Sequence, residues 1–256
     1  MKYLPQLNYN KIDEVLDNFD INNYFINQEK DDKPLLFHVY WYGELTEKQI
    51  LCIKSYLVTQ DLSKTLLIVW LDCEFTYSKD NIAKIPKHKN IQVKPYMPDV
   101  YAHKTLLSNQ KYVTITPDSE HTNLVKYRSD LARIILLYLY GGIYYDLDMI
   151  LLKDFSDFKD IEFCYQWSNK SQRGNNGLLG LKKHSAIGVE IMKSYNKVLN
   201  KFTSKYDFNT RLNKKIYNSE LDINCLPCAL FDPVWLAFDC DESSRYSNLD
   251  NFDDFF

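Results

Sequence analysis

Residues 127–148 read YRSDLARIILLYLYGGIYYDLD, and this stretch decides the fold class. A helix is predicted over residues 123–140, and its apolar side chains surround it on almost all sides after Leu131, which indicates a buried helix. Gly141 and Gly142 end the helix, and a strand predicted over residues 143–152 follows at once. A buried helix joined directly to a buried strand is typical of an α/β protein.

Five charged side chains lie in this stretch, and four of them, Asp130, Arg133, Asp146 and Asp148, are candidate functional residues. Asp130 and Arg133 have the i,i+3 spacing of an ion pair on one helix, and such a pair is the simplest structural explanation for their presence. Asp146 and Asp148 lie near the carboxyl end of the predicted strand, the end at which parallel sheets bind ligands.

The spacing of Asp146 and Asp148 predicts a cation site. Residues two apart on a straight strand share one face, so both carboxylates can converge on a cation, or bracket it if the strand bends. Oxygen ligands favour Mg²⁺ or Mn²⁺, and such ions complete their shells with water and phosphate oxygens. A diphosphate is therefore the expected remaining ligand.

The rest of the chain predicts a Rossmann-like sheet. The residues Thr46 to Gln49 form a capping box that starts a helix between predicted strands at residues 35–42 and 65–71. Further elements are expected as strands at residues 91–96, 161–167 and 177–181 and as a helix at residues 184–202. We predict one domain, with a mostly parallel central sheet flanked by helices.

Composition argues against two classes of partner. The chain carries 31 basic and 34 acidic residues, which are mixed along the sequence and do not form the basic footprint of a nucleic-acid binder. No segment approaches the ~20 apolar residues of a membrane span, and the amino-terminal residues lack the apolar core of a secretory signal. These patterns predict no transmembrane segment and a cytoplasmic location.

The stretch quoted above resembles glycosyltransferase family 32, whose members carry a DXD motif and are related in their core to glucosylating bacterial toxins. The family pattern is Ser-Asp-x-x-Arg on a helix, then Gly-Gly, an aromatic strand and Asp-x-Asp. The matching positions, in the same order and spacing, are Ser129, Asp130, Arg133, Gly141, Gly142, Tyr144, Asp146 and Asp148. Similar segments lie at residues 39–43 and 175–180.

The resemblance implies a GT-A fold and a retaining transfer of a sugar from a UDP-sugar or GDP-sugar to a glycan, a protein or another hydroxyl acceptor. It implies that residues 1–202 form the catalytic core, with a helical segment at residues 1–33. Residues 203–256 are expected to complete the site or its acceptor side and to end in an acidic, mobile tail.

The resemblance also implies a role for each matching residue. Trp41, between Tyr40 and Tyr42, is expected to flank the nucleotide base, while Asp130 and Arg133 hold the sugar and its phosphate side. Asp146 is expected to contact the ribose and the Mn²⁺ or Mg²⁺ ion, and Asp148 to ligate the ion directly. Asn175 or Asn176 is expected to reach the transferred sugar. Tyr144 and Trp235 are also expected to bind the substrate.

Two other enzyme activities and one non-catalytic function are compatible with parts of the pattern. A phosphohydrolase of the haloacid dehalogenase type also uses Asp-x-Asp and Mg²⁺, but has it near the start of the chain. A glycoside hydrolase needs two carboxylates on opposite sides of a sugar, roughly 5 to 9.5 Å apart, which an adjacent pair fits poorly. The non-enzymatic alternative is a module that binds a sugar or a nucleotide without turnover.

Overall fold

The computed structural model describes residues 2–3, 33–74, 76–110, 113, 123–167, 174–199 and 222–231. The strands in these ranges are β1 (Lys2–Tyr3), β2 (Leu35–Trp41), β3 (Thr65–Asp72), β4 (Ile91–Tyr96), β5 (Gly142–Tyr145), β6 (Phe163–Gln166), β7 (Gly174–Leu181) and β8 (Asn224–Leu226). The helices are α2 (Glu47–Thr59), α3 (Lys79–Lys84), α4 (Pro98–Ala102), α5 (Asn123–Tyr140) and α6 (Ala186–Leu199). Two short 3-10 helices are η4 (Ser156–Phe158) and η5 (Cys228–Leu230).

The described strands form one eight-stranded sheet in the order β1-β8-β6-β7-β5-β2-β3-β4. Strands β2, β3, β4 and β5 run parallel to one another, and β6, β8 and β1 form a second parallel group. Strand β7 pairs antiparallel with both β5 and β6, so it is the one reversed strand among those described. The predicted mostly parallel sheet is confirmed.

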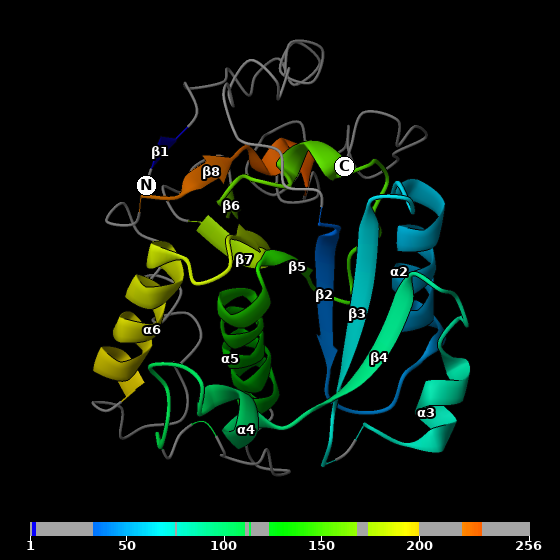
Figure 1. The fold of residues 1–256 in the computed structure, drawn as a ribbon, viewed down its shortest axis with the longest axis horizontal. Helices are drawn as coiled ribbons and strands as arrows, with labels where there is room; N and C mark the ends of the chain where they lie inside the picture. Colours follow the sequence, from blue (N-terminus) through cyan, green and yellow to red (C-terminus); the bar gives the residue numbers. More distant parts are fainter. Residues whose placement is uncertain are drawn as a thin grey trace, which may run out of the picture.

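Helices cover both faces of the sheet (Figure 1). Alternate side chains of β2 point to opposite faces, so Tyr40 packs in the cluster that contains the α5 residues, while Phe37 and Val39 pack in the cluster that contains α2. The result is a three-layer sandwich. The capping box predicted at the start of α2 is confirmed, because the backbone N–H of Thr46 donates to Oε1 of Gln49 at 3.0 Å.

Helix α5 runs over the predicted residues 123–140, and two glycines explain its sharp end. Gly141 has φ +72° and its N–H donates to the carbonyl of Leu137 at 2.8 Å, a left-handed cap. Gly142 has φ +106°, and a Cβ there would lie 2.2 Å from the carbonyl oxygen of Leu36. Only glycine permits both this backbone conformation and the close approach of β5 to β2.

The strand predicted at residues 143–152 is much shorter in the structure. Strand β5 ends at Tyr145, and the next four residues form a turn in which the N–H of Met149 donates to the carbonyl of Asp146 at 3.1 Å. Asp146 and Asp148 therefore do not share the face of a straight strand. The chain bends between them, which corresponds to the bracketing alternative.

Other elements differ from the sequence-based expectation mainly in length. Strand β7 begins at Gly174 instead of residue 177, β6 covers Phe163–Gln166, and α6 begins at Ala186. Strand β8 had no counterpart in the prediction, and it joins the sheet by pairing with β6. Within residues 1–33, which were expected to be helical, the described residues 2–3 instead form strand β1. Residues 4–32, Trp235 and the acidic tail lie outside the described residues.

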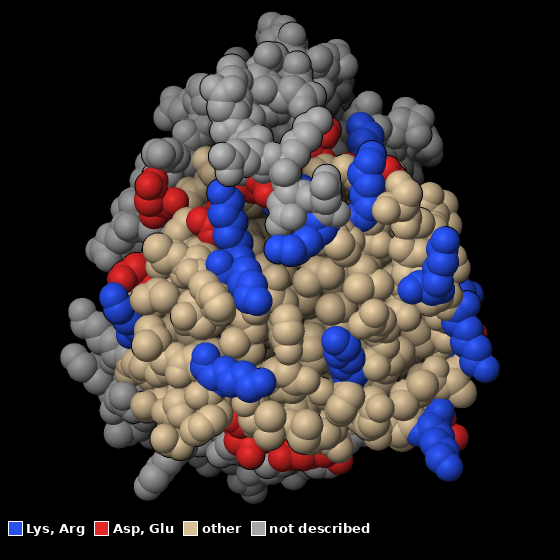
Figure 2. Space-filling model, viewed as in Figure 1, with Lys and Arg blue, Asp and Glu red and all other residues tan. Residues whose placement is uncertain are grey.

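The described surface shows no sign of a membrane span. Within the described ranges, no helix combines the length and the apolar character needed to cross a bilayer. On the face seen in Figure 2, Lys and Arg side chains are scattered among uncharged residues and form no continuous stripe.

Candidate functional site

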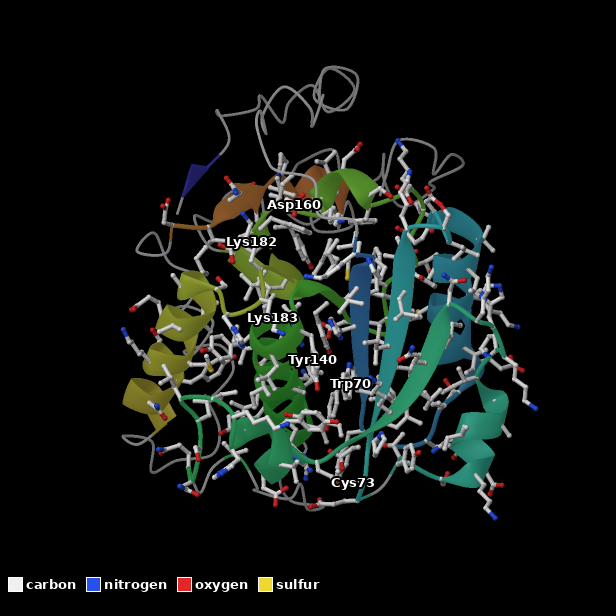
Figure 3. The ribbon with its side chains drawn as sticks, viewed as in Figure 1. Trp70, Cys73, Tyr140, Asp160, Lys182 and Lys183 are labelled. Atoms are coloured by element: carbon white, nitrogen blue, oxygen red, sulfur yellow. The ribbon has the colours of Figure 1, made fainter. Side chains whose placement is uncertain are left out.

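The candidate site lies where the chain leaves β2 and β5, at the carboxyl ends of these neighbouring parallel strands. The chain continues from β2 to β3 and β4 on one side of this point, and from β5 to β6 and β7 on the other side, so the sheet order reverses here. Such points form crevices that bind ligands. Cys73, which follows β3, marks this edge of the sheet at the lower end of Figure 3.

A pocket of about 670 Å³ occupies this edge. Its walls come from the end of β2, the first half of α5, the turn after β5, and the ends of β6 and β7. The lining residues are Tyr40, Trp41, Tyr42, Val125, Lys126, Ser129, Asp130, Arg133, Asp146, Leu147, Asp148, Trp167, Asn175 and Asn176.

Arg133 organises the centre of the pocket. Its Nη2 donates to Oδ1 of Asp146 at 2.9 Å and to Oγ of Ser129 at 3.0 Å. Its Nη1 donates to the backbone carbonyl of Asn176, and its guanidinium carbon lies 4.8 Å from the centre of the Tyr144 ring. Because the side chain is only 5% exposed, these contacts hold the guanidinium in one position.

The two carboxylates of the Asp-x-Asp motif differ in their surroundings. The Asp146 side chain is 31% exposed, yet burial of its carboxylate raises its pKa to about 6, an effect that the charge of Arg133 opposes. The neighbouring negative charges of Asp148 and Asp130 raise it further. Asp148 is exposed at the mouth of the pocket. A cation beside Asp146 would favour its ionised form and reverse this shift.

Asp130 and Asn176 form a buried polar pair at the back of the pocket. The Asn176 amide donates to Oδ1 of Asp130 at 2.9 Å, and Nη2 of Arg133 lies 3.5 Å from the same oxygen. Burial raises the pKa of Asp130, while the Arg133 charge and the Asn176 hydrogen bond lower it. The predicted ion pair between Asp130 and Arg133 is therefore present, but the shorter contact of Arg133 is with Asp146.

Gly177 lies close to three side-chain oxygen atoms, which a larger residue would crowd. A Cβ at this position would lie 3.2 Å from Oδ2 of Asp146, 3.4 Å from Oδ1 of Asn175 and 3.4 Å from the Tyr165 hydroxyl. The Asn175 amide donates to that hydroxyl at 2.7 Å. Glycine thus keeps the second carboxylate oxygen of Asp146 free of protein carbon.

An aromatic wall closes the side of the pocket formed by β2. Tyr40 is buried, and its hydroxyl donates to Oδ2 of Asp72 at 2.8 Å. Trp41 is partly exposed, and its Nε1 donates to the carbonyl of Glu44 at 3.0 Å. Tyr42 is partly exposed and lies over the guanidinium of Arg128.

The structure brings nearly all predicted site residues to this one pocket. The exceptions are Tyr144, which is fully buried behind Arg133, and Trp235, which lies outside the described residues. Sequence reasoning missed Lys126, Ser129 and Trp167 as lining residues. For Lys126 a signal existed, since it is four residues before Asp130 and seven before Arg133, on the same face of α5.

The arrangement fits a hard divalent cation. The chemistry of the donor set is that of two carboxylates at a pocket mouth, with one oxygen of Asp146 left clear by Gly177. In the described part of the chain, no third His, Cys, Asp or Glu joins them in a group that could hold a metal. Water and ligand oxygens are therefore needed to complete such a site.

Residues 73–167, which include α5, β5 and the two carboxylates, match the family described as the glycosyltransferase sugar-binding region containing a DXD motif. This part of the chain is therefore similar to a DXD-type glycosyltransferase region. This match confirms the resemblance that residues 127–148 indicated, and it agrees with the geometry of the pocket.

Solved structures resemble this chain at low sequence identity. The PaToxG glycosyltransferase superposes with a TM-score of 0.52 at 15% identity, over 82% of this chain and 75% of that one. A galactosyltransferase LgtC, solved with donor and acceptor sugar analogues, gives 0.49 at 12% identity over 75% and 73% of the two chains. No curated protein sequence matches this chain significantly. The PaToxG likeness shows that the two proteins share a fold.

Proposed function

We propose that this chain transfers a sugar from a UDP-sugar or GDP-sugar to a hydroxyl group of a glycan, a protein or another acceptor. The observation that carries the proposal is that one pocket at the carboxyl edge of the described sheet gathers an aromatic wall, a helix face that bears the exposed Lys126, and two carboxylates. Each part suits one portion of a nucleotide sugar. The DXD-type family match supports the same assignment.

The aromatic wall suits the nucleoside end of the donor. Trp41 and Tyr42 offer partly exposed rings at the end of β2. Aromatic side chains stack on nucleobases without requiring one particular base, because every base has a π-face. Both uracil and guanine remain compatible with this wall.

Charged residues on the opposite walls suit the diphosphate and the sugar. Lys126 is exposed on the pocket face of α5, near its amino-terminal end, where the helix dipole also favours an anion. Asp130 and Asn176 present buried polar atoms that can hydrogen-bond sugar hydroxyls. Asn175 lies beside them in the same pocket and offers its amide in the same way.

Asp146 and Asp148 would hold a Mn²⁺ or Mg²⁺ ion together with oxygens of the diphosphate. When bound, the ion supplies Lewis-acid stabilisation of the charge on the departing nucleoside diphosphate. Arg133 orients Asp146 toward the pocket through the contact at 2.9 Å. Asp146 is also expected to reach the ribose.

Retention of the anomeric configuration follows from the family resemblance alone. A retaining transfer needs no separate carboxylate as base, because a departing phosphate oxygen can accept the proton of the acceptor hydroxyl. The pocket provides no carboxylate beyond Asp130, Asp146 and Asp148 among its described lining residues. This set is compatible with that route.

The proposal is tested by a thermal-shift panel of nucleotide sugars with and without Mn²⁺, followed by an assay of sugar release and transfer. We expect one UDP-sugar or GDP-sugar to raise the melting temperature only when Mn²⁺ is present, and to be turned over. Asp148→Asn is the matched inactive control. Nucleotide binding without any turnover would favour the non-catalytic module, and a phosphoryl group trapped on Asp146 would favour the phosphohydrolase.

A further inference from the structure

Arg128 is a buried arginine beside the pocket, in the segment of α5 that precedes the residues of the family pattern. Its Nη2 lies 2.9 Å from Oδ2 of Asp72, at the end of β3, and the two side chains are 1% and 0% exposed. Its Nη1 donates to Oε2 of Glu74 at 2.8 Å, and the Glu74 side chain is 40% exposed. Three charged groups from α5 and the end of β3 therefore meet beneath the pocket wall.

A buried ion pair of this kind calls for an explanation other than stability. Removing two charges from water costs free energy that their attraction often does not recover, and well-packed apolar side chains commonly replace such pairs without loss. Two nitrogen atoms of Arg128, Nε and Nη2, also lack a well-aligned hydrogen-bond acceptor among the described residues. The pair is better understood through the residues that it contacts.

Those residues are the aromatic wall of the pocket. The guanidinium carbon of Arg128 lies 5.2 Å from the centre of the Tyr42 ring, within cation–π range. Its partner Asp72 accepts the hydroxyl hydrogen bond of Tyr40 at 2.8 Å. Tyr40 and Tyr42 both line the pocket, whereas Arg128, Asp72 and Glu74 do not. The buried charges thus act on the pocket through two tyrosines.

The contact with Tyr42 matters because this ring stands on a chain segment without regular structure. Strand β2 ends at Trp41, and Tyr42 follows it, just before Gly43 with φ +118°. Without a contact to one face, a partly exposed ring at this position would sample several rotamers. The guanidinium of Arg128 gives the ring a fixed support.

We propose that Arg128, held by Asp72 and Glu74, is a positioning residue that fixes the Tyr42 ring in the pocket wall, where the ring contacts the nucleobase of the donor. The inference rests on the proposed function, since it concerns the base-binding end of the same site. It adds residues that lie outside the family pattern. Preorganising one aromatic ring lowers the entropic cost of binding the base.

The test compares nucleoside diphosphates with inorganic pyrophosphate, each titrated calorimetrically in the presence of Mn²⁺. The variant Asp72→Asn/Arg128→Met removes both buried charges together, so neither is left buried without the other, and the carboxylate of Glu74, whose side chain is 40% exposed, stays in contact with water. We expect its affinity for UDP or GDP to fall about 10-fold, the scale of one base–aromatic contact. Its affinity for pyrophosphate should stay at the wild-type value. Equal losses for both ligands, or no loss for either, would overturn the proposal.

Further variants separate positioning from folding. Tyr42→Leu should give a similar loss, and adding it to the Asp72→Asn/Arg128→Met variant should give no further loss if both act through one ring. Arg128→Lys keeps the charge but not the flat guanidinium, and should show an intermediate loss for UDP or GDP while the melting temperature stays near the wild-type value. If the double variant does not fold, Arg128→Lys alone tests whether Arg128 positions the Tyr42 ring.

Lys94→Met is the matched control, because Lys94 makes a cation–π contact with Trp70 at 5.7 Å and neither residue lines the pocket. It should leave nucleotide affinity unchanged. A wild-type protein that binds neither UDP nor GDP would contradict the proposed function itself. A wild-type protein that binds one of them, with unchanged affinity in the Arg128 variants, would contradict only the role of Arg128.

Discussion

Nη2 of Arg133 lies 2.9 Å from Oδ1 of Asp146, which joins the middle of α5 to the turn after β5. The contact brings the two halves of the family pattern together, because Ser-Asp-x-x-Arg lies on the helix and Asp-x-Asp follows the strand. Arg133 partly neutralises Asp146, so Asp146 and Asp148 can lie close together before a cation binds. The positive charge of Arg133 thus lies next to the first carboxylate of the Asp-x-Asp motif.

Replacing Arg133 should therefore harm both activity and stability. Arg133→Ala leaves Asp146 and Asp130 without their cation, and we expect a loss of about 2 kcal/mol in the free energy of unfolding, less than for a fully buried pair because Asp146 is partly exposed. Turnover of the donor should fall about 100-fold or more. Denaturant titration and steady-state kinetics measure the two effects.

The double variant Arg133→Met/Asp146→Asn supplies the control for this prediction. Removing both charges should restore only part of the lost stability, because the buried Asp130 still lacks its cation, and should restore none of the activity. If Arg133→Ala lowers the melting temperature while turnover per folded molecule stays normal, then the arginine is only a structural ion-pair partner.

Asp148→Asn should abolish metal-dependent turnover and leave the fold intact. The substitution removes charge and keeps volume, and Asp148 is exposed at the mouth of the pocket, so its loss exposes no cavity. Binding of Mn²⁺, followed by calorimetry or by its paramagnetic effect on water relaxation, should weaken about 10-fold or more. Full activity in this variant would refute the metal role.

Lys126→Gln should weaken binding of the diphosphate portion of the donor. Lys126 is an exposed lysine in the pocket lining, and one charged contact is worth roughly a 10-fold change in affinity. We expect weaker binding of UDP or GDP, a shallower dependence on salt, and unchanged binding of the free nucleoside. Lys54→Gln, on the exposed face of α2, is the control. Equal effects of the two variants would exclude a specific contact.

Two glycine substitutions should have different effects, one on the stability of the fold and the other on metal binding and turnover. Gly142→Ala places a Cβ 2.2 Å from a backbone oxygen at φ +106°, and should destabilise the protein by about 3 kcal/mol or more. Gly177→Ala meets only the site oxygens at 3.2 to 3.4 Å, with ordinary backbone conformation. It should reduce Mn²⁺ affinity and turnover with little change in melting temperature. A Gly177→Ala enzyme of normal activity would show that the space beside Asp146 is not used.

His38 should make stability fall at acidic pH. Its buried ring accepts from Nε1 of Trp70 at 3.1 Å through Nδ1, which leaves Nε2 to donate to the Gly141 carbonyl at 2.9 Å. The rings of Trp70 and Tyr140, labelled in Figure 3, lie next to the His38 ring and stack on each other, with 5.6 Å between the two ring centroids. Both hydrogen bonds require the neutral ring, and burial lowers the pKa of His38 to about 4.

The sign of the effect follows from proton binding. The unfolded chain takes up a proton near pH 6.5, whereas the folded chain resists it down to about pH 4. The contribution of His38 to the free energy of unfolding is therefore fully present above pH 6.5. It declines as the pH falls toward 4, by an amount on the order of 2 to 3 kcal/mol. Urea titrations across this range should show a flatter dependence for His38→Gln than for the wild type. His103→Gln, whose ring is exposed, should keep the wild-type dependence.

The elements that sequence predicted most accurately have strong local signals. Helix α5 has its predicted bounds because apolar side chains run up to two glycines that can adopt positive φ. Strand β4 likewise covers the predicted residues 91–96. Asp130, Arg133, Asp146 and Asp148, which the family pattern singled out, all line the same pocket. Their roles in binding and catalysis stay predictions.

Elements that depend on distant partners were predicted less well. Strand β5 ends early because Asp146 begins a turn, while its N–H still donates to the carbonyl of Gly177 on β7 at 2.8 Å. Strand β8 exists through its pairing with β6, about sixty residues away in sequence. Neither its three residues nor their neighbours carry a periodic signal strong enough to predict it.

By itself, the sequence determined the α/β class, the buried helix, the glycine cap and the identity of the acidic pair, because these depend on residue type and on spacing over a few positions. Only the tertiary structure decided that Arg133 contacts Asp146, that Lys126 faces the pocket, and that Arg128 pairs with Asp72 beneath Tyr42. These relationships join side chains from separate strands and helices. Their geometry is set by how the elements pack on the sheet, and sequence spacing carries no record of it.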